Sequence, residues 1–250
     1  MSELALTDIL DPRPEAVQPI PGSVHIPLSE LRHRVHELPR KSQLVRIPDG
    51  DYAVEGLAVL EALGRKGLIL DELPESSENR FRLWSPNRFL EEVAPQLRPS
   101  AALDIACGVG RDAVYLADRG WNVTAVDHLP DALAIGQDLE MRYAAGCPSI
   151  RWVKADASSI ESGRVDLITS FFFLDRTVFR TAKDWLAPGG NLLLETFTTT
   201  HAAKFGKPRP AWCLEPGELL SFASGLEVVV HEESWHEKGH TARLWARKAH

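Results

Sequence analysis

The sequence contains little cysteine and no long apolar run. Its three cysteines, Cys107, Cys147 and Cys213, stand far apart among 250 residues, so they form neither a CxxC pair nor a disulfide framework. This usage is typical of a reducing compartment and predicts a cytoplasmic location. No apolar stretch approaches the ~18 residues of a membrane-spanning helix, and the opening MSELALTDIL lacks the pattern of a secretory signal. We therefore expect no membrane partner.

An excess of basic charge is also missing. The formal net charge is −7, divided as −4 over residues 1–73 and −3 over residues 74–250. A nucleic-acid-binding domain normally carries a basic excess, so we expect no nucleic-acid partner, although a local basic patch is compatible with these totals. Apolar residues make up 44% and charged residues 25% of the chain, which is ordinary globular usage.

The chain is expected to form two domains. The segment PESSENR, residues 74–80, is polar and has no apolar periodicity, which is typical of a linker. It separates a small domain at residues 1–73 from a larger one at residues 81–250. In the small domain, strands are expected at 43–47 and 68–71 with a helix at 53–63 between them, an α/β arrangement.

In the larger domain, predicted strands alternate with predicted helices. The strands are expected at 101–106, 122–126, 150–153, 165–171, 191–197, 226–232 and 240–247, and the helices at 111–118, 131–143, 177–186 and 216–223. This alternation predicts an α/β fold with a mainly parallel sheet that helices cover on both faces. The last two strands are joined by a short loop, so they are expected to pair antiparallel.

The most informative stretch is ALDIACGVGRDA, residues 102–113. A strand runs into Gly108 and Gly110, where the backbone can turn tightly and a ligand can come close. Asp127 ends the next strand, where a carboxylate can accept both hydroxyls of a ribose. Residues 108–113 also satisfy the G-x-G-x-x-G/A fingerprint of dinucleotide-binding proteins, which keeps an NAD(P)-binding oxidoreductase as an alternative.

Three features favour a different nucleotide ligand. Asp104 lies on the strand just before the glycine turn, where it would repel a pyrophosphate but suits an ammonium group. Asp156 ends the third strand, where it can accept a hydrogen bond from an adenine amino group. The antiparallel closing strands are the third feature. Together they describe a ligand with a cationic amino-acid end, a ribose and an adenine, which is S-adenosylmethionine.

The segment LDIACGVGRDAVYLADRGWNVTAVD resembles the cofactor-binding region of class I S-adenosylmethionine-dependent methyltransferases, most closely the small bacterial tellurite-resistance and thiopurine methyltransferase type. The resemblance spans roughly residues 81–248, with VKADA, VDLITSFFFLD and LAPGGNLLLETF in the expected order. It implies a Rossmann-like sheet, mainly parallel with its last strand antiparallel. One departure is Ala106, which stands where the family pattern has glycine.

The resemblance also implies a cofactor site. Asp104 would face the methionine amino group, Asp127 would hold the ribose, and Asp156 would meet the adenine. The full implied set is Asp104, Ala106, Gly108, Gly110, Asp127, His128, Asp156, Ala157, Ser170 and Phe171. Taken singly, each acid is equally well explained as an exposed strand-end or capping residue.

The acceptor is expected to be a small molecule. The cofactor supplies the electrophile, so the protein has to align the reactants and exclude water. A thiolate or tellurite-type nucleophile needs little or no base, whereas a hydroxyl or amine needs one. The segment FFFLD, residues 171–175, lacks the Asp/Asn-Pro-Pro-aromatic motif of enzymes that methylate adenine or glutamine. We therefore prefer a thiol or a metalloid oxyanion.

Several side chains are candidates for acting on the acceptor. Arg176 and Arg209 are candidates for holding an anion, and His201 is a candidate base; for each, the alternative is a solvated loop residue. Glu195, Thr196 and Lys204 are further polar candidates near the fifth strand. The three phenylalanines 171–173 would either stabilise the sulfonium through cation–π attraction or pack in the core.

Two other segments have a functional and a structural interpretation. Trp84, Pro86 and Arg88 either begin a lid over the active site or pack against the sheet. The histidines at 231, 236 and 240 are better explained as part of a surface hairpin than as metal ligands, so no metal is expected.

The stretch GSVHIPLSELRHRVHELPRKSQLVRI resembles the first half of a rhodanese domain. That family places a nucleophilic cysteine after the strand, where this chain has Pro48, Asp49 and Asp51 and no cysteine before Cys107. Pro48 removes a backbone donor, and the two carboxylates would repel a sulfur anion. The resemblance therefore implies a degenerate rhodanese-like domain that supports the fold or contacts another protein. A third possibility for the whole chain is a non-enzymatic regulatory protein that binds S-adenosylmethionine.

Overall fold

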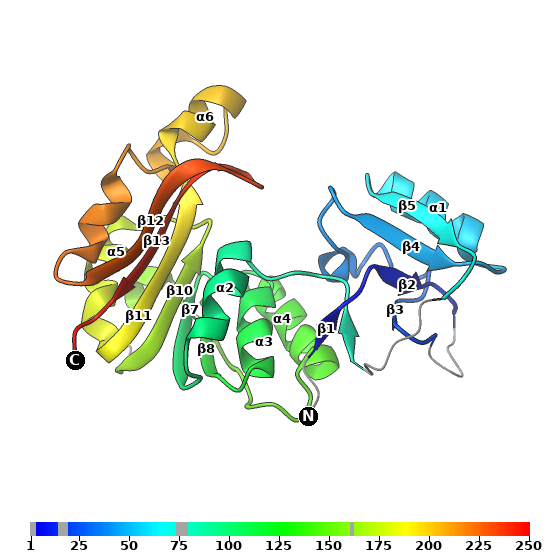
Figure 1. The fold of residues 1–250 in the computed structure, drawn as a ribbon, viewed down its shortest axis with the longest axis horizontal. Helices are drawn as coiled ribbons and strands as arrows, with labels where there is room; N and C mark the ends of the chain where they lie inside the picture. Colours follow the sequence, from blue (N-terminus) through cyan, green and yellow to red (C-terminus); the bar gives the residue numbers. More distant parts are fainter. Residues whose placement is uncertain (1–3, 15–19, 74–79, 161–162) are drawn as a thin grey trace. The chain divides into compact units, whose positions relative to one another are not determined.

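The chain forms two compact units, Met1–Ser85 and Pro86–His250 (Figure 1). The computed structural model describes residues 4–14, 20–73, 80–160 and 163–250. The expected linker at 74–80 therefore lies, apart from Arg80, outside the described residues. The division falls later in the chain than expected, because Phe81–Arg82 forms a strand that pairs within the first unit.

The first unit is built on parallel strands. A four-stranded sheet has the order β3 (Ser23–His25), β2 (Ile9–Asp11), β4 (Leu44–Pro48) and β5 (Lys66–Leu70). The helix α1 (Ala53–Ala62) joins β4 to β5. Outside this sheet, β1 (Ala5–Leu6) pairs in parallel with β6 (Phe81–Arg82). The strand–helix–strand expected from the sequence is confirmed as β4, α1 and β5. The strands β2 and β3 were missed because three residues are too few to show a periodicity.

The first unit buries a carboxylate, Asp11, completely. The free-energy cost of burying this charge is offset by Arg13, whose Nε and Nη2 donate to the two carboxylate oxygens at 2.9 and 2.8 Å. Leu10, Ile47 and Leu60 are also fully buried. The unit thus has its own packed core, and a bidentate pair closes the end of β2.

The second unit holds a seven-stranded sheet. Its helices and strands are α2 (Arg88–Val93), β7 (Ala101–Ile105), α3 (Arg111–Asp118), β8 (Asn122–Asp127), α4 (Pro130–Tyr143), β9 (Arg151–Lys154), β10 (Val165–Phe171), α5 (Arg176–Ala182), β11 (Leu186–Phe197), α6 (Thr199–Phe205), β12 (Glu227–His236) and β13 (Gly239–Arg247), with short 3₁₀ helices at Ala94–Gln96, Ala157–Ser159, Lys183–Trp185, Pro210–Trp212 and Glu218–Ala223.

The strand order is β12-β13-β11-β10-β7-β8-β9. Every neighbouring pair from β11 to β9 is parallel, and β13 runs antiparallel to both β11 and β12. The expected Rossmann-like sheet with an antiparallel closing strand is therefore confirmed. Chain order reverses between β7 and β10, and such a switch point creates a crevice at the carboxyl ends of the strands.

Helices cover both faces of this sheet. α3 and α4 lie on one face and α5 on the other (Figure 1). The core includes Ile105 of β7, Ile168 of β10, Phe179 of α5 and Phe222, all with 1% exposure or less. Buried apolar strands of this kind are typical of parallel sheets with two covered faces.

Several elements differ from the sequence-based expectation. The helix expected at 177–186 ends at Ala182 and continues as a 3₁₀ turn, and β11 begins already at Leu186. The hairpin is longer than expected, because β12 continues to His236, which pairs with Gly239. The polar residues at 233–239 suggested a turn. A strand at the sheet edge leaves one side in water, however, and tolerates polar residues at 233–236.

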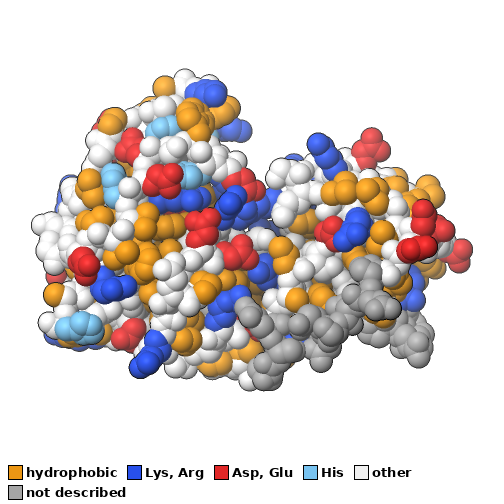
Figure 2. Space-filling view, in the orientation of Figure 1, with side chains coloured by type: hydrophobic (Ala, Val, Ile, Leu, Met, Phe, Trp, Pro, Cys, Tyr) orange, Lys and Arg blue, Asp and Glu red, His pale blue; other side chains and the backbone are white. Residues whose placement is uncertain are grey.

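The surface carries mixed charge. Figure 2 shows acidic and basic side chains interspersed on each unit in this view. Among the helices that the structure describes, none is both long enough and apolar enough to cross a membrane.

Candidate active site

The predicted cofactor residues gather where the parallel strands end. A cavity of about 160 Å³ lies at the ends of β8 and β9. Its lining includes Ala106, Asp127, His128, Asp156 and Ala157. The fold thus brings together five of the residues that the resemblance implied, from three separate segments of the chain.

Asp104 is buried with one oxygen unsatisfied. The side chain, on β7, is 2% exposed, and its Oδ1 accepts from the hydroxyl of Thr169 at 2.9 Å. Its Oδ2 is buried and has no hydrogen-bond partner. Burial, reinforced by the charges of Asp112 and Asp127, holds the pKa of Asp104 well above its ordinary value. A cationic group placed beside Oδ2 would remove this penalty.

The neighbouring loop is electrostatically negative. Burial raises the pKa of the Cys107 thiol, and the charges of Asp104 and Asp127 raise it further. Cys107 is therefore a neutral thiol and no nucleophile. A pyrophosphate would meet the same repulsion, whereas a ligand with ammonium and sulfonium charges would be attracted.

Asp127 holds the glycine loop in place. Its Oδ2 accepts from the backbone N–H of Gly108 at 2.8 Å, and its Oδ1 accepts from the N–H of Leu129 at 2.9 Å. The Nδ1 of His128 lies 3.4 Å from Oδ1. A carboxylate oxygen has two lone pairs, so each oxygen of Asp127 retains acceptor capacity for a ribose hydroxyl.

The two glycines of the turn serve different purposes. Both are left-handed, with φ of 55° at Gly108 and 74° at Gly110. A Cβ on Gly108 would meet nothing within 4 Å, so this position leaves room for a ligand. A Cβ on Gly110 would collide with the ring of Trp152. We expected both glycines to let the backbone pass the cofactor. At Gly110, however, the absence of a side chain makes room for the ring of Trp152.

Alanine substitutions should separate these two roles. Gly110→Ala should lower the free energy of unfolding by about 2–4 kcal/mol, because backbone strain adds to the clash with Trp152. Gly108→Ala should cost only the strain, about 1–2 kcal/mol, but should weaken cofactor binding. Urea unfolding and calorimetric titration measure the two effects. Equal unfolding losses in the two variants would contradict this division.

Ala106 occupies a conformation that favours glycine. Its φ is 56°, and it lines the smaller cavity. A left-handed alanine is strained by about 1–2 kcal/mol. Alanine in place of the glycine of the family pattern therefore puts a methyl group, on a strained backbone, at the edge of the predicted site.

Three other predicted cofactor residues have varied surroundings. Asp156 is exposed, and hydrogen bonds from the hydroxyl and N–H of Ser158 lower its pKa, so it stays charged. Ser170 is fully buried, and its hydroxyl donates to the carbonyl of Ile105 at 3.0 Å. Phe171 is half-buried on β10. Neither Ser170 nor Phe171 is among the residues lining the cavities described here.

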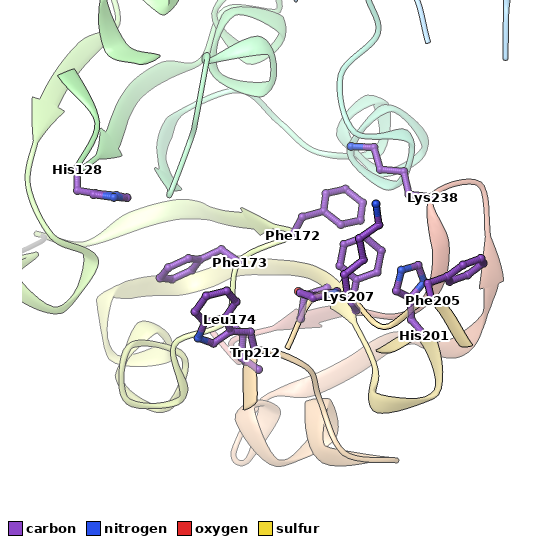
Figure 3. A pocket seen from close by; sticks show the side chains of 12 residues that line it. His128, Phe172, Phe173, Leu174, His201, Phe205, Lys207, Trp212 and Lys238 are labelled. Atoms are coloured by element: carbon purple, nitrogen blue, oxygen red, sulfur yellow. The ribbon is translucent and has the colours of Figure 1, made fainter. Parts of the chain in front are cut away.

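A second, larger cavity adjoins the first. Its volume is about 960 Å³, and it shares His128 and Phe173 with the smaller one. The residues lining it are His128, Phe172, Phe173, Leu174, Thr196, Phe197, His201, Phe205, Lys207, Pro208, Trp212 and Lys238 (Figure 3). The aromatic side chains come from the ends of β10 and β11, α6 and the segment after it.

Phe172 is the most unusual residue of this lining. Its φ is 58°, an outlier for a bulky residue, and its N–H donates to the carbonyl of Glu195 at 2.7 Å. Its ring packs 5.2 Å from that of Phe197. Phe172 and Phe173 are only partly buried and line the cavity, and Phe173 also packs against the core of the second unit.

His201 lies in the wall of the larger cavity. It is buried, and its ring stacks between Phe197 and Phe205 at centroid distances of 4.3 and 4.7 Å. Its Nδ1 accepts from the backbone N–H of His240 at 3.3 Å. Burial lowers its pKa, and His240 and Lys207 lower it further. His201 is therefore a neutral imidazole at physiological pH.

The two predicted arginines do not line either cavity. Arg176 donates through Nε and Nη2 to the carboxylate of Glu218 at 2.6 and 2.8 Å, and also to the carbonyls of Ala211 and Cys213. These bonds tie α5 to the segments that follow α6. Arg209 is exposed, with its guanidinium 5.3 Å from the ring centre of Trp212. Acceptor binding by either arginine remains a prediction.

The other polar candidate of β11, Glu195, is part of a buried network. Its Oε1 accepts from Thr241 at 2.8 Å and from Arg243 at 3.1 Å, and its Oε2 accepts from Asn87 at 2.9 Å. Asn87 also caps α2. This network holds the start of α2, which we considered as a lid, against β11. Both oxygens of Glu195 accept hydrogen bonds within it.

Two of the three histidines of the hairpin, His236 and His240, have separate partners. His236 contacts Thr241 and Glu232, at 2.7 and 3.2 Å, and His240 contacts Thr198 at 2.7 Å. Within the described ranges, no group of three or more His, Cys, Asp or Glu side chains is arranged to hold a metal.

Sequence reasoning missed several residues of the larger cavity, notably Lys207, Trp212 and Lys238. Lys207 and Trp212 lie close to Arg209 in sequence, so the basic and aromatic composition around Arg209 was a usable signal. Lys238 is in the hairpin turn, far away in sequence, and only the folding of β12 and β13 brings it to this cavity.

The second unit is similar to known methyltransferases. Residues 102–190 match the family model described as "Methyltransferase domain". An uncharacterized protein of Schizosaccharomyces pombe, UNK4.09, is 28% identical over 223 positions that cover 70% of this chain and 66% of that protein. The "probable S-adenosyl-L-methionine-dependent methyltransferase TehB" of Haemophilus influenzae is 24% identical, covering 58% of this chain and 52% of TehB.

Solved structures share the fold. The crystal structure of TehB from Haemophilus influenzae has a TM-score of 0.53 and 22% identity, covering 65% of this chain and 62% of that chain. Magnesium protoporphyrin IX methyltransferase (ChlM) from Synechocystis, solved with bound S-adenosylmethionine, has a TM-score of 0.51 and 16% identity, covering 65% and 79%.

The chain spans about half to two thirds of the length of the curated relatives it matches. The family match lies wholly within the second unit. The rhodanese-like character of the first unit is not confirmed and stays a prediction. Residues 102–190 match a methyltransferase domain model, and the second unit shares its fold with solved methyltransferases.

Proposed function

We propose that this protein transfers a methyl group from S-adenosylmethionine to a small molecule. The observation that carries the proposal is the buried, unpartnered Oδ2 of Asp104. It lies within a group of acids, Asp104, Asp112 and Asp127, whose charges reinforce one another. Such a site attracts a cationic nucleotide and repels a pyrophosphate, which also disfavours the NAD(P)-binding alternative.

The described residues fit this cofactor. Asp104 would pair with its ammonium group, Asp127 would accept from its ribose, and Asp156 with Ala157 would border its adenine. Gly108 leaves the space that the cofactor needs. When bound, the cofactor supplies an electrophilic methyl group on a sulfonium.

The remaining task of the protein is to place the acceptor. The larger cavity adjoins the cofactor residues through His128 and Phe173, so an acceptor held there lies next to the cofactor site. Its aromatic walls would exclude water, and alignment of the two reactants would lower the barrier. The sequence alone favoured a thiol or a metalloid oxyanion as the acceptor.

Calorimetric titration tests the cofactor assignment. We expect micromolar binding of S-adenosylmethionine and of its product S-adenosylhomocysteine, and no binding of NADH. Asp127→Ala should abolish binding, because it removes the ribose acceptor and releases the N–H of Gly108. Asp138→Ala, an exposed acid on α4, is the matched control and should bind normally. Binding of NADH alone would overturn the proposal in favour of an oxidoreductase.

The proposal extends to the rest of the chain. Intact cofactor binding without transfer to any acceptor would favour the non-enzymatic regulatory alternative. The first unit, with no cysteine before Cys107, is proposed to be a degenerate rhodanese-like domain with a supporting or protein-binding role, and the protein is proposed to work in the cytoplasm.

A further inference from the structure

The first unit leaves one edge of its larger sheet open. β5 is the last strand of the four-stranded sheet, and β4 is its partner. The register between them runs without a bulge from Leu44 opposite Lys66 to Pro48 opposite Leu70. β5 has the sequence KGLIL, and Leu68 is 38% exposed. An edge strand attracts a further strand unless a bulge, a charge or a short length protects it, and β5 has only Lys66 for this purpose.

The other edges of the two larger sheets are protected. β12 has a bulge between Val228 and Val230 and carries several glutamates. β9, at the opposite edge of the same sheet, begins with Arg151 and ends with Lys154. β3, at the other edge of the four-stranded sheet, has only three residues. Among these four edges, β5 is therefore the one most open to another strand.

The open backbone groups of β5 belong to Gly67 and Ile69. The carbonyl of Leu70 points towards β4, because it accepts from the N–H of Asp49 at 3.1 Å. The N–H and C=O groups of successive residues in a strand point to alternate sides. Those of Gly67 and Ile69 therefore point away from β4, and no loop or turn in the described part of the chain bonds to them. These groups can bind an added strand.

The sequence of β5 fits a second copy of itself in antiparallel pairing. Contacts in a two-fold dimer are reciprocal, so placing Gly67 opposite the partner's Ile69 also places Ile69 opposite the partner's Gly67. Each of these two pairs would exchange both backbone hydrogen bonds. Leu68 lies between them and would face its own copy as a closely spaced apolar pair. This register uses the outward-pointing groups and covers an exposed leucine.

The charges at the two ends of β5 agree with this register. Lys66 is the first residue of the strand, and the exposed acids Asp71 and Glu72 follow its last residue. Antiparallel pairing brings the lysine of each copy next to the acids of the other. Opposite charges placed across neighbouring strands stabilise their pairing.

The shape of the surface beside β5 also agrees. Gly67 faces α1, because a Cβ at this position would collide with Leu57. Residues two apart in a strand share a face, and residues opposite each other in neighbouring strands do so as well. The partner's Ile69 would therefore project on the α1 side, beside Gly67. A cavity of about 500 Å³ lies there, lined in part by Leu57 and Gly67.

We propose that β5 is a self-association surface, and that a second copy of this chain pairs with it in antiparallel orientation. The sheet of the first unit then continues into the sheet of its partner. This gives the protein-binding role proposed for the first unit a defined partner. The inference goes beyond methyl transfer and does not depend on cofactor binding.

Analytical ultracentrifugation of the full chain in a reducing buffer tests the dimer. The wild type should shift from one-chain to two-chain species as its concentration rises. Leu68→Lys places like charges opposite each other and should weaken dimerisation at least about tenfold. Val54→Lys is the matched control, because Val54 is 73% exposed on α1, and it should dimerise like the wild type. A wild type that stays monomeric at every concentration would overturn the proposal, as would unchanged dimerisation of Leu68→Lys.

Mixing two variants tests the register. Leu68→Glu should be as monomeric as Leu68→Lys, since it also places like charges opposite each other. An equimolar mixture of the two should dimerise again, because each lysine then faces a glutamate. Recovery would also show that both variants are folded. Failure of the mixture to dimerise would contradict the pairing of position 68 with its own copy.

Cysteine cross-linking gives an independent measurement. Leu68→Cys, oxidised with diamide, should form more covalent dimer than the wild type, which has three cysteines of its own, because directly opposite positions lie within disulfide range. Lys66→Cys is the control, since the two copies of position 66 would lie about 13 Å apart along the strands. Equal cross-linking of the two variants would overturn the register.

Titration of the same variants with S-adenosylmethionine separates this proposal from the proposed function. Leu68→Lys and Val54→Lys should bind the cofactor like the wild type, because neither residue lines the smaller cavity. If S-adenosylmethionine binds to none of these proteins, the proposed function fails, and the sedimentation results still decide whether β5 forms the dimer.

Discussion

Replacing Asp104 by asparagine should abolish productive binding of S-adenosylmethionine and at the same time stabilise the ligand-free protein. The substitution keeps the size of the side chain and its bond with the hydroxyl of Thr169, but it removes the carboxyl group, whose ionisation is disfavoured by burial. We expect affinity for the cofactor to fall at least about 100-fold. The free energy of unfolding without ligand should rise by about 1–3 kcal/mol at neutral pH.

The direction of the pH dependence follows from the raised pKa of Asp104. Between the ordinary pKa of an aspartate and the raised value, the folded protein holds a proton that the unfolded chain has released. The stability of the ligand-free wild type should therefore fall as pH rises through this window. Asp104→Asn should lack that fall. Cofactor affinity of the wild type should rise with pH across the same window, because the cation favours the ionised carboxylate.

Methylthioadenosine is the matched ligand for this test, since it lacks the amino-acid end of the cofactor. Asp104→Asn should leave its affinity nearly unchanged, which separates loss of the ammonium contact from damage to the site. Asp138→Asn on the surface of α4 is the protein control and should change neither affinity nor stability. Unaltered binding of S-adenosylmethionine to Asp104→Asn would refute the assigned role of Asp104.

The buried network around Glu195 gives the second large effect. Asn87→Asp would place a carboxylate against Oε2 of Glu195, in place of the amide that now donates at 2.9 Å. The asparagine cannot rotate to avoid the change, because its Oδ1 caps α2 by accepting from the N–H groups of Phe89 and Leu90. Glu195→Gln would place two amide donors face to face and remove the buried negative charge that pairs with Arg243. Each single change should cost about 3 kcal/mol.

The double variant Asn87→Asp with Glu195→Gln exchanges the donor and the acceptor. We expect it to recover about 1–3 kcal/mol relative to the sum of the single variants. Urea unfolding of the four proteins measures this coupling. Strict additivity would show that the two side chains do not interact as the structure indicates. Cofactor affinity, measured in parallel, should be retained in any variant that folds, because the smaller cavity does not include these residues.

Much of the predicted cofactor site followed from local patterns. The sequence has a short apolar strand that ends in a glycine turn, and it has acids at the ends of successive strands. These residues are expected to lie close together, because the carboxyl ends of parallel strands meet at one edge of the sheet. Asp127 and Asp156 were placed correctly at that edge for this reason. Asp104 was chosen from its position before the turn, but its hydrogen bond with Thr169, which lies on the neighbouring strand and 65 positions away in sequence, is seen only in the structure.

The acceptor side of the site required the tertiary structure. Arg176 and Glu195 resembled catalytic side chains in sequence, and the fold engages them with Glu218 and Arg243. Gly110 resembled a ligand-binding glycine, and the fold packs Trp152 against it.

The sequence by itself determined the class of sheet, the glycine turn and the acids that border the smaller cavity, because these depend on strand periodicity and on residues next to strand ends. Only the tertiary structure decided which side chains line the larger cavity and which proton His201 carries. Lys238 reaches that cavity through the pairing of β12 with β13, and the tautomer of His201 depends on a backbone N–H 39 residues away. Long-range pairing of this kind leaves no periodic signal in the chain.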